Sequence, residues 1–289
     1  MIFAARRLAR LLPDSAYLRL LYRRAHGRWP DLRRPRTFDE KMQWYKLHYR
    51  DPLMTTLSDK YAVRLWLEAQ GQGRLLNELI GVYDRPEEID PAALPERFVI
   101  KATHGSNMNL ICRDKGALDW GAARSAMRRW LRRDYFESGR QWCYKGIPRR
   151  LICERYLENE EHGELLDYKF YCYGGRPDTV WVCSGRHSGR LAYNAYDMEW
   201  NRVPVFKGKP GSGLDIRRPD GFAAMVDTAR RLSGDFPFVR VDLYWVEERA
   251  IFGEFTFYPD SGIVPFSPDR FNAAFGDLMV LPGERQETR

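Results

Sequence analysis

The stretch FPFVRVDLYWVEERAIFGEFTFYPDSGIV, residues 236–264, decides the fold expected for this chain. Apolar and polar residues alternate over 239–245, the period-two pattern of a strand with two chemically different faces. The charged residues 247–249 predict a turn, and a second alternating run follows over 251–258. The two runs therefore predict a β-hairpin with strict alternation in both strands.

Four polar residues of this hairpin gather on one face if the two strands pair. Two carboxylates, Asp242 and Glu254, would then lie beside the guanidinium of Arg240 and the hydroxyl of Thr256. This set suits a divalent cation with phosphate ligands, because Mg²⁺ takes hard oxygen donors and usually keeps substrate phosphates. The alternative from the pattern alone is a charged hairpin face in contact with solvent.

The composition is that of a folded globular protein with more than one lobe. The chain has 289 residues, of which 44% are hydrophobic and 14% aromatic, enough for a large core. Its formal net charge of +8 favours anionic partners such as nucleotides, acidic polymers, a membrane surface or nucleic acid. Nucleic acid is disfavoured, because the aromatic residues are spread through predicted core strands rather than grouped for base stacking.

The cysteines indicate a reducing compartment. Five are present with no CxxC pair, and Cys153, Cys172 and Cys183 lie inside apolar runs where small buried thiols are expected. We therefore expect a cytoplasmic protein, with the inner face of the membrane as an alternative position. No run approaches the roughly 18 apolar residues of a membrane-spanning helix.

The N-terminus is both basic and apolar. Arg6, Arg7 and Arg10 interrupt what would have to be the continuous apolar core of a secretory signal peptide, so we do not expect one. Its leucines predict two short amphipathic helices broken at Pro13. Such helices are expected to pack on the main body, and peripheral contact with a membrane surface is the alternative.

Helix signals follow along the chain. Thr37 stands three residues before Glu40, a capping-box spacing that predicts a helix up to His48. Ser58 is expected to open a second helix, which ends near Gly71. Two more helices are predicted over residues 119–134 and 220–234.

A second hairpin is predicted over residues 98–112. Its apolar first strand leads to Lys101 and then to a small tip at His104–Asn107. A glycine-containing tip lets backbone amides approach phosphate oxygens closely, although no GxxxxGK[ST] motif is present and the tip is not a Walker loop. Other strands are expected over residues 75–83, 151–158, 168–173, 180–183 and 190–206.

Together these motifs resemble the ATP-grasp superfamily. Four features occur in the order that is typical of that superfamily. They are a lysine near a helix start, a lysine-bearing strand with a glycine tip, a glutamate-bearing strand, and Asp followed by Glu-x-Thr on a late hairpin. The chain is similar, more narrowly, to the teichuronopeptide-biosynthesis (TupA-like) type from about Thr37 to about Pro268. The segments that carry the resemblance are TFDEKMQW, SDKYAVR, FVIKATHGSN, ICERYL, DYKFYCYGG and VRVDLY…GEFTFYPDSG.

The resemblance implies an α+β protein with the ATP-grasp fold. Two α+β lobes with antiparallel sheets would enclose a nucleotide, and a helical N-terminal extension would precede them. We expect the helical extension at residues 1–56 and a short α/β segment at residues 57–95. The small lobe with the glycine tip is expected at residues 96–157, and the large lobe with the metal-site hairpin at residues 158–289.

The resemblance also implies contacts to the nucleotide phosphates. Lys60 and Lys101 are similar to the two lysines that contact the phosphates. The compact ammonium group of a lysine offsets the negative charge of a phosphate. Lys169 resembles a further phosphate or acyl-phosphate contact. The loop that would close over the triphosphate consists of His104, Gly105, Ser106 and Asn107.

Base and ribose contacts are implied by ICERYL and the residues after it. Glu154 is expected to accept a hydrogen bond from the exocyclic amine, while main-chain groups of the hinge read the base edge. Glu161 is the candidate for the ribose hydroxyls, and the adjacent Glu160 leaves that register open. The hinge consists of Glu154, Arg155, Tyr156 and Leu157.

The opening hairpin takes a defined role in the resemblance. Asp242 and Glu254 resemble the Mg²⁺ ligands that bridge the β and γ phosphates, and Arg240 resembles the residue that stabilises charge on the transferred group. Thr256 stands where many members of the superfamily have asparagine; its hydroxyl can ligate Mg²⁺, but the side chain is shorter. ATP and Mg²⁺ are thus the implied cofactors. The implied catalytic residues are Arg240, Lys101 and Lys169.

The implied chemistry is ATP-dependent carboxylate–amine ligation through an acyl phosphate, on a cell-surface polysaccharide or peptide precursor. The partners would be ATP and substrates of sugar or amino-acid type. Two alternatives are a phosphotransferase such as a sugar kinase, and a non-catalytic nucleotide-binding component of a sugar-transfer assembly. The expected substrate contacts are Arg186 and His187, for an anionic sugar or amino acid, and Ser261 and Gly262, for the acceptor carboxylate.

Overall fold

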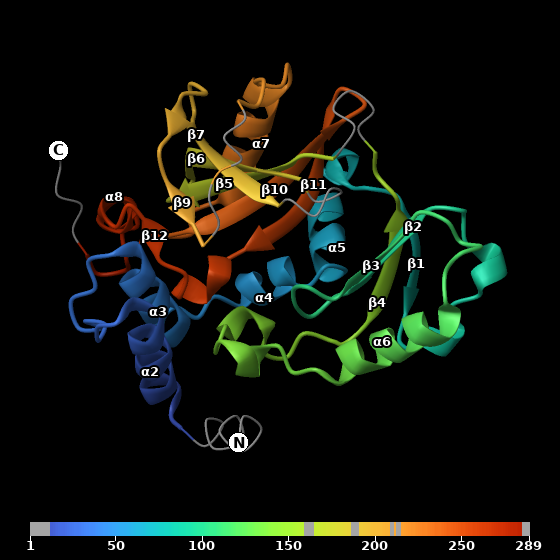
Figure 1. Cartoon of the computed structure of the whole chain (residues 1–289), viewed down its shortest axis with the longest axis horizontal. Coiled ribbons are helices and arrows are strands. Elements are labelled where there is room, and N and C mark those ends of the chain that lie inside the picture. The colour runs from blue at the N-terminus through green and yellow to red at the C-terminus, as the bar shows by residue number, and fades with distance from the viewer. Residues whose placement is uncertain (1–11, 159–164, 186–190, 209–210, 212–214, 285–289) are drawn as a thin grey trace.

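The computed structural model describes residues 12–158, 165–185, 191–208, 211 and 215–284, which form two α+β lobes (Figure 1). The strands of the small lobe form one antiparallel sheet with the spatial order β1 (Leu79–Tyr83), β4 (Leu151–Arg155), β2 (Phe98–Ala102) and β3 (Asn109–Cys112). The large lobe has a six-stranded antiparallel sheet with the order β11 (Arg249–Thr256), β10 (Val239–Val246), β5 (Asp167–Tyr173), β6 (Arg176–Ser184), β7 (Ala192–Asp197) and β8 (Arg202–Val203). A separate two-stranded ribbon pairs β12 (Phe266–Ser267) with β9 (Phe206–Lys207). The α+β class predicted from the sequence is confirmed.

Within the described residues, the α-helices are α2 (Asp14–His26), α3 (Phe38–His48), α4 (Pro52–Ser58), α5 (Ala62–Ala69), α6 (Trp120–Arg132), α7 (Phe222–Ser233) and α8 (Arg270–Leu278). Helix α6 packs against the small sheet, and α7 packs against β5, β6 and β10 of the large sheet. Helices α4 and α5 lie between the two sheets, whereas α2 and α3 lie beside the large lobe (Figure 1). The helical elements therefore both cover the sheets and connect the lobes.

Strand β2 shows how the small lobe separates its core from the space between the lobes. Its residues alternate in burial, and Phe98 and Ile100 lie in a core with Met127 of α6. The ring of Phe98 stacks on Trp120 at a centroid distance of 6.0 Å. Lys101 belongs to the opposite face of the strand and is only half-buried. The predicted hairpin thus presents its lysine on the side away from α6.

The helix starts follow local capping chemistry, with one correction. The predicted capping box of α3 is present, because Thr37 accepts from the backbone of Glu40 and the Glu40 side chain accepts in return. The expectation that Ser58 opens a helix is wrong, since Ser58 is the last residue of α4. Asp51 caps α4 and Pro52 occupies its first position, which together make a stronger start signal.

The predicted hairpin of β10 and β11 is confirmed, but its strict alternation is wrong. Asp242 lies opposite Glu254, whereas the next residue, Leu243, lies opposite Phe252, so Gly253 forms a β-bulge. A Cβ atom on Gly253 would lie 3.0 Å from the backbone oxygen of Asp242. Glycine permits this close approach, and the extra residue turns Phe252 into the core, where it is buried.

The cysteines and the lengths of the helices bear on the cellular compartment expected for the chain. All five cysteines are buried free thiols, as predicted for Cys153, Cys172 and Cys183. Among the described residues, no helix combines the length and the apolar character needed to cross a bilayer.

Candidate active site

The large lobe contributes a row of charged side chains across three neighbouring strands. Asp242 on β10 lies directly opposite Lys169 on β5 and Glu254 on β11, so the three residues share one face of the sheet. The Lys169 ammonium pairs with Asp242 and lies 2.6 Å from Oδ2 of Asp167. Asp242 and Lys169 are buried. The sheet register therefore brings Asp242 together with Lys169, which lies 73 positions earlier in the sequence, and with Glu254, which lies 12 positions later.

Arg240 joins the two carboxylates of this row. Its Nε donates to Asp242 Oδ1 at 2.6 Å, and its Nη2 donates to Asp242 Oδ2 at 2.7 Å and to Glu254 Oε1 at 3.2 Å. Thr256 Oγ1 lies 3.4 Å from the same Glu254 oxygen. The four residues predicted to gather on one hairpin face are therefore together.

The charges of the row depend on one another. Burial alone raises the pKa of Glu254, but Lys60, Arg240, Lys169 and Lys101 outweigh it and lower the pKa to about 2. Burial alone lowers the pKa of Lys169, but the neighbouring aspartates outweigh it and the pKa is raised. The carboxylate of Glu254 and the ammonium of Lys169 are consequently charged at neutral pH.

The small lobe contributes a second ion-pair cluster. Lys101 Nζ donates to Glu154 Oε2 at 2.6 Å, and Arg64 Nη1 donates to Glu154 Oε1 at 2.7 Å. Arg64 also donates to the carbonyl of Asn77. Glu154 is buried, so its carboxylate is neutralised by two cations from different elements. The hinge glutamate implied by the resemblance thus binds protein cations here.

Lys60 lies where the two lobes meet. Its Nζ donates to the carbonyl of Gly105, in the tip of the small-lobe hairpin, at 2.6 Å and lies 3.7 Å from Glu254 Oε2 of the large lobe. Gly105 is required at this point because a Cβ atom would lie 2.6 Å from the ring of Tyr135. One lysine therefore connects the predicted phosphate loop to the predicted metal hairpin.

The remaining tip residues do not all face the same way. His104 is buried and its Nε2 lies 3.0 Å from the Trp130 carbonyl of α6; burial lowers its pKa, so the ring is neutral at pH 7. Ser106 hydrogen-bonds to Tyr135, and Asn107 is exposed with a φ of 57°. The tip is anchored at His104 and presents Asn107 at its surface.

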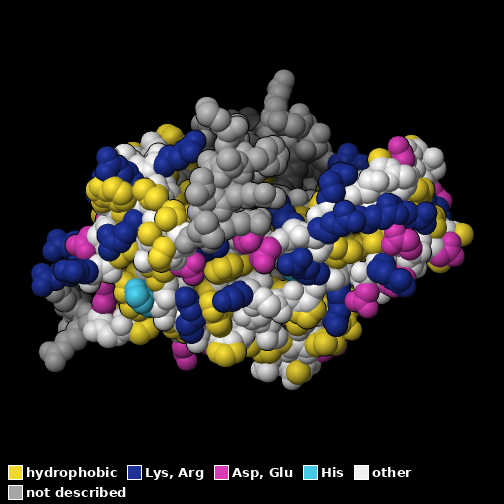
Figure 2. Space-filling view, turned by 90° about the horizontal axis from the view of Figure 1, so that it is seen from below, with side chains coloured by type: hydrophobic (Ala, Val, Ile, Leu, Met, Phe, Trp, Pro, Cys, Tyr) yellow, Lys and Arg dark blue, Asp and Glu magenta, His cyan; other side chains and the backbone are white. Residues whose placement is uncertain are grey.

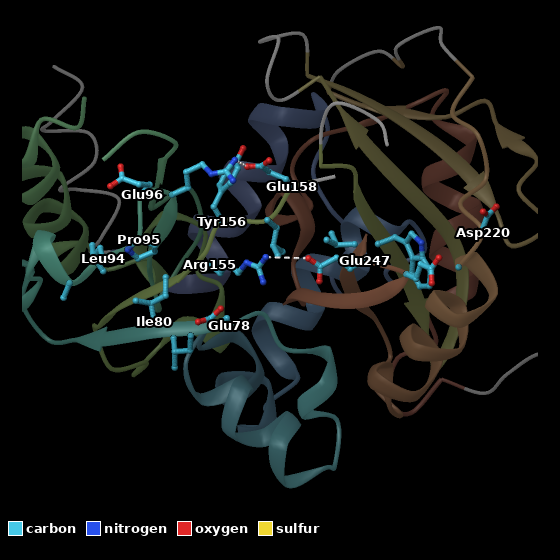
Figure 3. A pocket seen from close by; sticks show the side chains of 18 residues that line it. Glu78, Ile80, Leu94, Pro95, Glu96, Arg155, Tyr156, Glu158, Asp220 and Glu247 are labelled. Atoms are coloured by element: carbon cyan, nitrogen blue, oxygen red, sulfur yellow. Dashed lines mark hydrogen bonds and ion pairs between the residues drawn. The ribbon is translucent and has the colours of Figure 1, made fainter. Parts of the chain in front are cut away.

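The hinge borders a groove of about 1660 Å³ between the lobes (Figure 3). Arg155, Tyr156 and Leu157 line it from the end of β4, and the β10–β11 turn lines it from the large lobe. Arg155 lies 3.6 Å from Glu247 of that turn, an ion pair that spans the groove. Three of the four predicted hinge residues are thus next to open space, whereas Glu154 is buried and does not line the groove.

The loop after β11 is held by buried polar side chains of α3. Asp260, Ser261 and Gly262 have φ values of 49°, 57° and 57°, a conformation that costs energy in non-glycine residues. Lys46 Nζ donates to Ser261 O at 2.9 Å and to Ser261 Oγ at 3.1 Å. Gln43 Nε2 donates to Gly262 O at 2.7 Å. The two predicted acceptor-site residues are fixed in position by contacts from a distant helix.

The donor set fits a nucleotide-bound Mg²⁺ better than an all-protein metal site. Asp242, Glu254 and Thr256 offer two carboxylates and a hydroxyl on adjacent strands. Within the described residues, no group of three or more His, Cys, Asp or Glu side chains is arranged to hold a metal. Mg²⁺ is usually bound by one or two carboxylates together with substrate phosphates, so the residues present suit that mode.

Three residues near this site escaped the sequence reasoning, because their partners are distant in the chain. Arg64 lies in the quoted motif SDKYAVR, 90 positions before Glu154. Lys46 is four residues after the buried Met42, so it lies on the buried side of α3. A lysine at a position where the helix pattern expects an apolar residue indicates a buried cation with a specific partner. Asp167 is the first residue of β5 and belongs to the quoted segment DYKFYCYGG, which gives no separate signal for it. The predicted contacts Glu161, Arg186 and His187, and the neighbouring Glu160, lie outside the described residues.

Comparison with protein families identifies the chain. The family model described as TupA-like ATPgrasp matches residues 40–280, and the chain therefore belongs to the TupA-like ATP-grasp family. Comparison with curated proteins gives no significant match.

Three solved structures are similar to the chain at low sequence identity. D-alanine–D-alanine ligase from Helicobacter pylori is 11% identical, with a TM-score of 0.43, over 80% of this chain and 60% of that one. D-cycloserine synthetase DcsG is 15% identical, with a TM-score of 0.42, over 79% and 72%. A RimK domain ATP-grasp protein from Sphaerobacter thermophilus is 12% identical, with a TM-score of 0.41, over 78% and 69%. The match covers less than two thirds of the Helicobacter ligase.

Proposed function

We propose that this protein is an ATP-dependent carboxylate–amine ligase that forms an amide through an acyl phosphate. The observation that carries the proposal is the set of four cationic side chains around Glu254. All four lower the pKa of its carboxyl group, and they come from both lobes. They are Lys60, Lys101, Lys169 and Arg240. A site where four cations from both lobes converge suits a polyphosphate whose transfer builds up negative charge.

The proposed nucleotide lies between the two lobes. Lys60 and Lys101 would bind its phosphates, since both side chains are partly exposed and both lower the pKa of Glu254 in the large-lobe row. The backbone of the tip, including Ser106 and Asn107, would cover the triphosphate. The base would rest against Tyr156 and the hinge backbone, beside the inter-lobe groove.

Mg²⁺ would be held by Asp242 and Glu254, with Thr256 as a third oxygen donor. When bound there, it would neutralise charge on the phosphate oxygens. Arg240 already contacts both carboxylates, so its guanidinium is positioned to stabilise charge on the transferred phosphoryl group. Lys169 keeps the row electrically balanced between Asp167 and Asp242.

The proposed reaction has two steps. A carboxylate oxygen of the first substrate attacks the γ-phosphorus of ATP, ADP leaves, and an acyl phosphate forms. The amine nitrogen of the second substrate then attacks the acyl carbon, phosphate leaves with its bridging oxygen, and the nitrogen loses a proton to give the amide. Arg240, Lys60 and Lys101 would lower the first barrier by stabilising charge on the phosphoryl oxygens.

The acceptor carboxylate would bind at the loop after β11. Lys46 donates to the hydroxyl oxygen of Ser261, which leaves the hydroxyl hydrogen of Ser261 for donation to a carboxylate. The substrate class that we propose is a cell-surface polysaccharide or peptide precursor, as the resemblance to the teichuronopeptide-biosynthesis type implies. The five free thiols support a reaction in the cytoplasm.

Two measurements test the proposal. Calorimetry should detect Mg-ATP binding, and Lys101→Ala should weaken it about tenfold, because one phosphate contact to an ammonium is worth about 1.4 kcal/mol. Unchanged affinity in Lys101→Ala would rule out the proposed phosphate site. ADP release should then be screened over amino acids and uronic acids, with the products identified by mass spectrometry. Amide with ADP and phosphate supports a ligase, whereas a phosphorylated product identifies a kinase.

A further inference from the structure

We propose that helix α2 and the residues after it form a surface that binds a membrane containing anionic lipids. This basic–apolar surface is defined by Leu20, Arg23, Arg24 and Trp29. It precedes residues 40–280, the part of the chain that matches the family. The inference is therefore independent of the proposed ligase activity, and either one can fail without the other.

The four residues form one continuous patch. Arg23 and Arg24 follow Leu20 by three and four positions, which places them on the same helix face, and the buried Leu18 is on another face. The guanidinium of Arg23 lies 4.6 Å from the ring centroid of Trp29. Leu20 is 49% exposed and Trp29 is 51% exposed, so two large apolar side chains contact solvent among the arginines.

The surrounding segment is strongly basic. Residues 12–36 contain seven arginines and two aspartates, a net charge of +5. Both aspartates are engaged elsewhere, because Asp14 pairs with Arg140 at 3.1 Å and Asp31 accepts from backbone amides. Within the described residues, no carboxylate pairs with the exposed arginines of the segment. These are Arg23, Arg24, Arg28, Arg33, Arg34 and Arg36.

Helix α6 provides an internal comparison, because it is also 13 residues long and basic. Its arginines are partly engaged, since Arg128 pairs with Glu87 and Arg124 donates to the carbonyl of Ile89. None of its side chains is an exposed large hydrophobic residue. Helix α6 thus shows a basic helix whose apolar side is used inside the fold, whereas α2 exposes both kinds of group.

A membrane satisfies both components of the surface. Arginines bind the phosphates of anionic headgroups, while Leu and Trp side chains enter the interfacial region beside them. A soluble acidic polymer would neutralise the arginines but leave Leu20 and Trp29 in water. Helix α2 lies at the lower edge of the molecule, away from both sheets (Figure 1), and the view from below shows Lys and Arg side chains beside hydrophobic ones on that face (Figure 2).

The test is co-sedimentation of the full chain with vesicles of phosphatidylcholine, with and without phosphatidylglycerol. The wild-type protein should bind only the vesicles that contain phosphatidylglycerol. Arg23→Ala combined with Arg24→Ala should reduce the partition coefficient about 25-fold, at about fivefold for each arginine. Leu20→Ser should reduce it about fivefold, through the loss of apolar contact with the interface.

Matched controls separate this surface from general charge effects. Arg129→Ala combined with Arg132→Ala removes two exposed arginines from α6, and Leu65→Ser changes a leucine that is 51% exposed on α5. Both controls should bind the vesicles as the wild type does. Thermal unfolding should show that every variant keeps the wild-type midpoint.

Several results would overturn the proposal. They are a wild-type protein that ignores phosphatidylglycerol, an equal loss of binding in the α6 control, and full binding by Leu20→Ser. Binding to polyglutamate that matches vesicle binding and does not depend on Leu20 would identify an acidic polymer as the partner instead.

Discussion

The two halves of the candidate site neutralise their charges in different ways. In the large lobe, the Asp242 side chain is 2% exposed and is bonded to both Arg240 and Lys169. In the small lobe, the Lys101 side chain is 27% exposed and shares Glu154 with Arg64. A buried charge depends on its protein partners, whereas a partly exposed lysine can exchange its partner for a ligand. The large-lobe row is therefore preformed, and the small-lobe lysines are the groups that a polyphosphate can recruit.

Removing Lys169 should give the largest loss of stability. Lys169→Met removes the cation that Asp167 and Asp242 share and leaves these two buried carboxylates with Arg240, which contacts Asp242. The free energy of unfolding should fall by about 3 kcal/mol. Urea denaturation measures this change. Lys101→Met, in which Glu154 keeps Arg64, should lose about 1 kcal/mol or less. Equal losses in the two variants would contradict the difference between the lobes.

Lys60 should affect ligand affinity rather than stability. Lys60→Met removes the cation that links Gly105 of the tip to Glu254, and Mg-ATP affinity measured by calorimetry should fall about tenfold. Lys115 is a close control, because it also donates to a carbonyl at 2.6 Å and lies 3.7 Å from a carboxylate. Lys115→Met should leave the affinity unchanged. A similar loss in both variants would mean that general charge, and not this position, governs binding.

Acid should remove a smaller contribution from Glu254. Its pKa is lowered from 4.5 to about 2, so its stabilisation is complete above pH 4.5 and is lost as the pH falls toward 2. Because the side chain is partly exposed, solvent screening reduces the contribution to about 1 kcal/mol. The unfolding free energies of the wild type and Glu254→Gln should differ by this amount at neutral pH and converge in acid. A difference that persists in acid would show that the ion pairs are not its cause.

Local patterns predicted the parts of the fold that depend on near neighbours. The alternation in β10 and the spacing of Thr37 and Glu40 specify a strand and a helix start without reference to the rest of the chain. The bulge at Gly253 was missed because it depends on how β11 meets the backbone of Asp242. The end of α4 at Ser58 does not follow from the serine itself, because Asp51 and Pro52 start this helix earlier in the chain.

The candidate site was predictable in its charged residues but not in its pairings. The hairpin pattern placed Arg240, Asp242 and Glu254 on one face, and the resemblance implied Lys60 and Lys101 as phosphate contacts. The bonds of Lys46 to Ser261 cross 215 residues of sequence and cannot be read from any local pattern. Tertiary contacts of this kind decide which charges are neutralised by the protein and which remain available to a ligand.

The most direct test of the central claim is ADP release by Asp242→Asn. The nearly isosteric change removes the charge that Arg240 and Lys169 share. The matched control is Asp227→Asn on the exposed face of α7, and far-UV circular dichroism confirms folding. Turnover with the substrates found in the screen should fall at least about 100-fold in Asp242→Asn alone. Wild-type turnover in a folded Asp242→Asn protein would contradict the assignment of this row as the phosphoryl-transfer site.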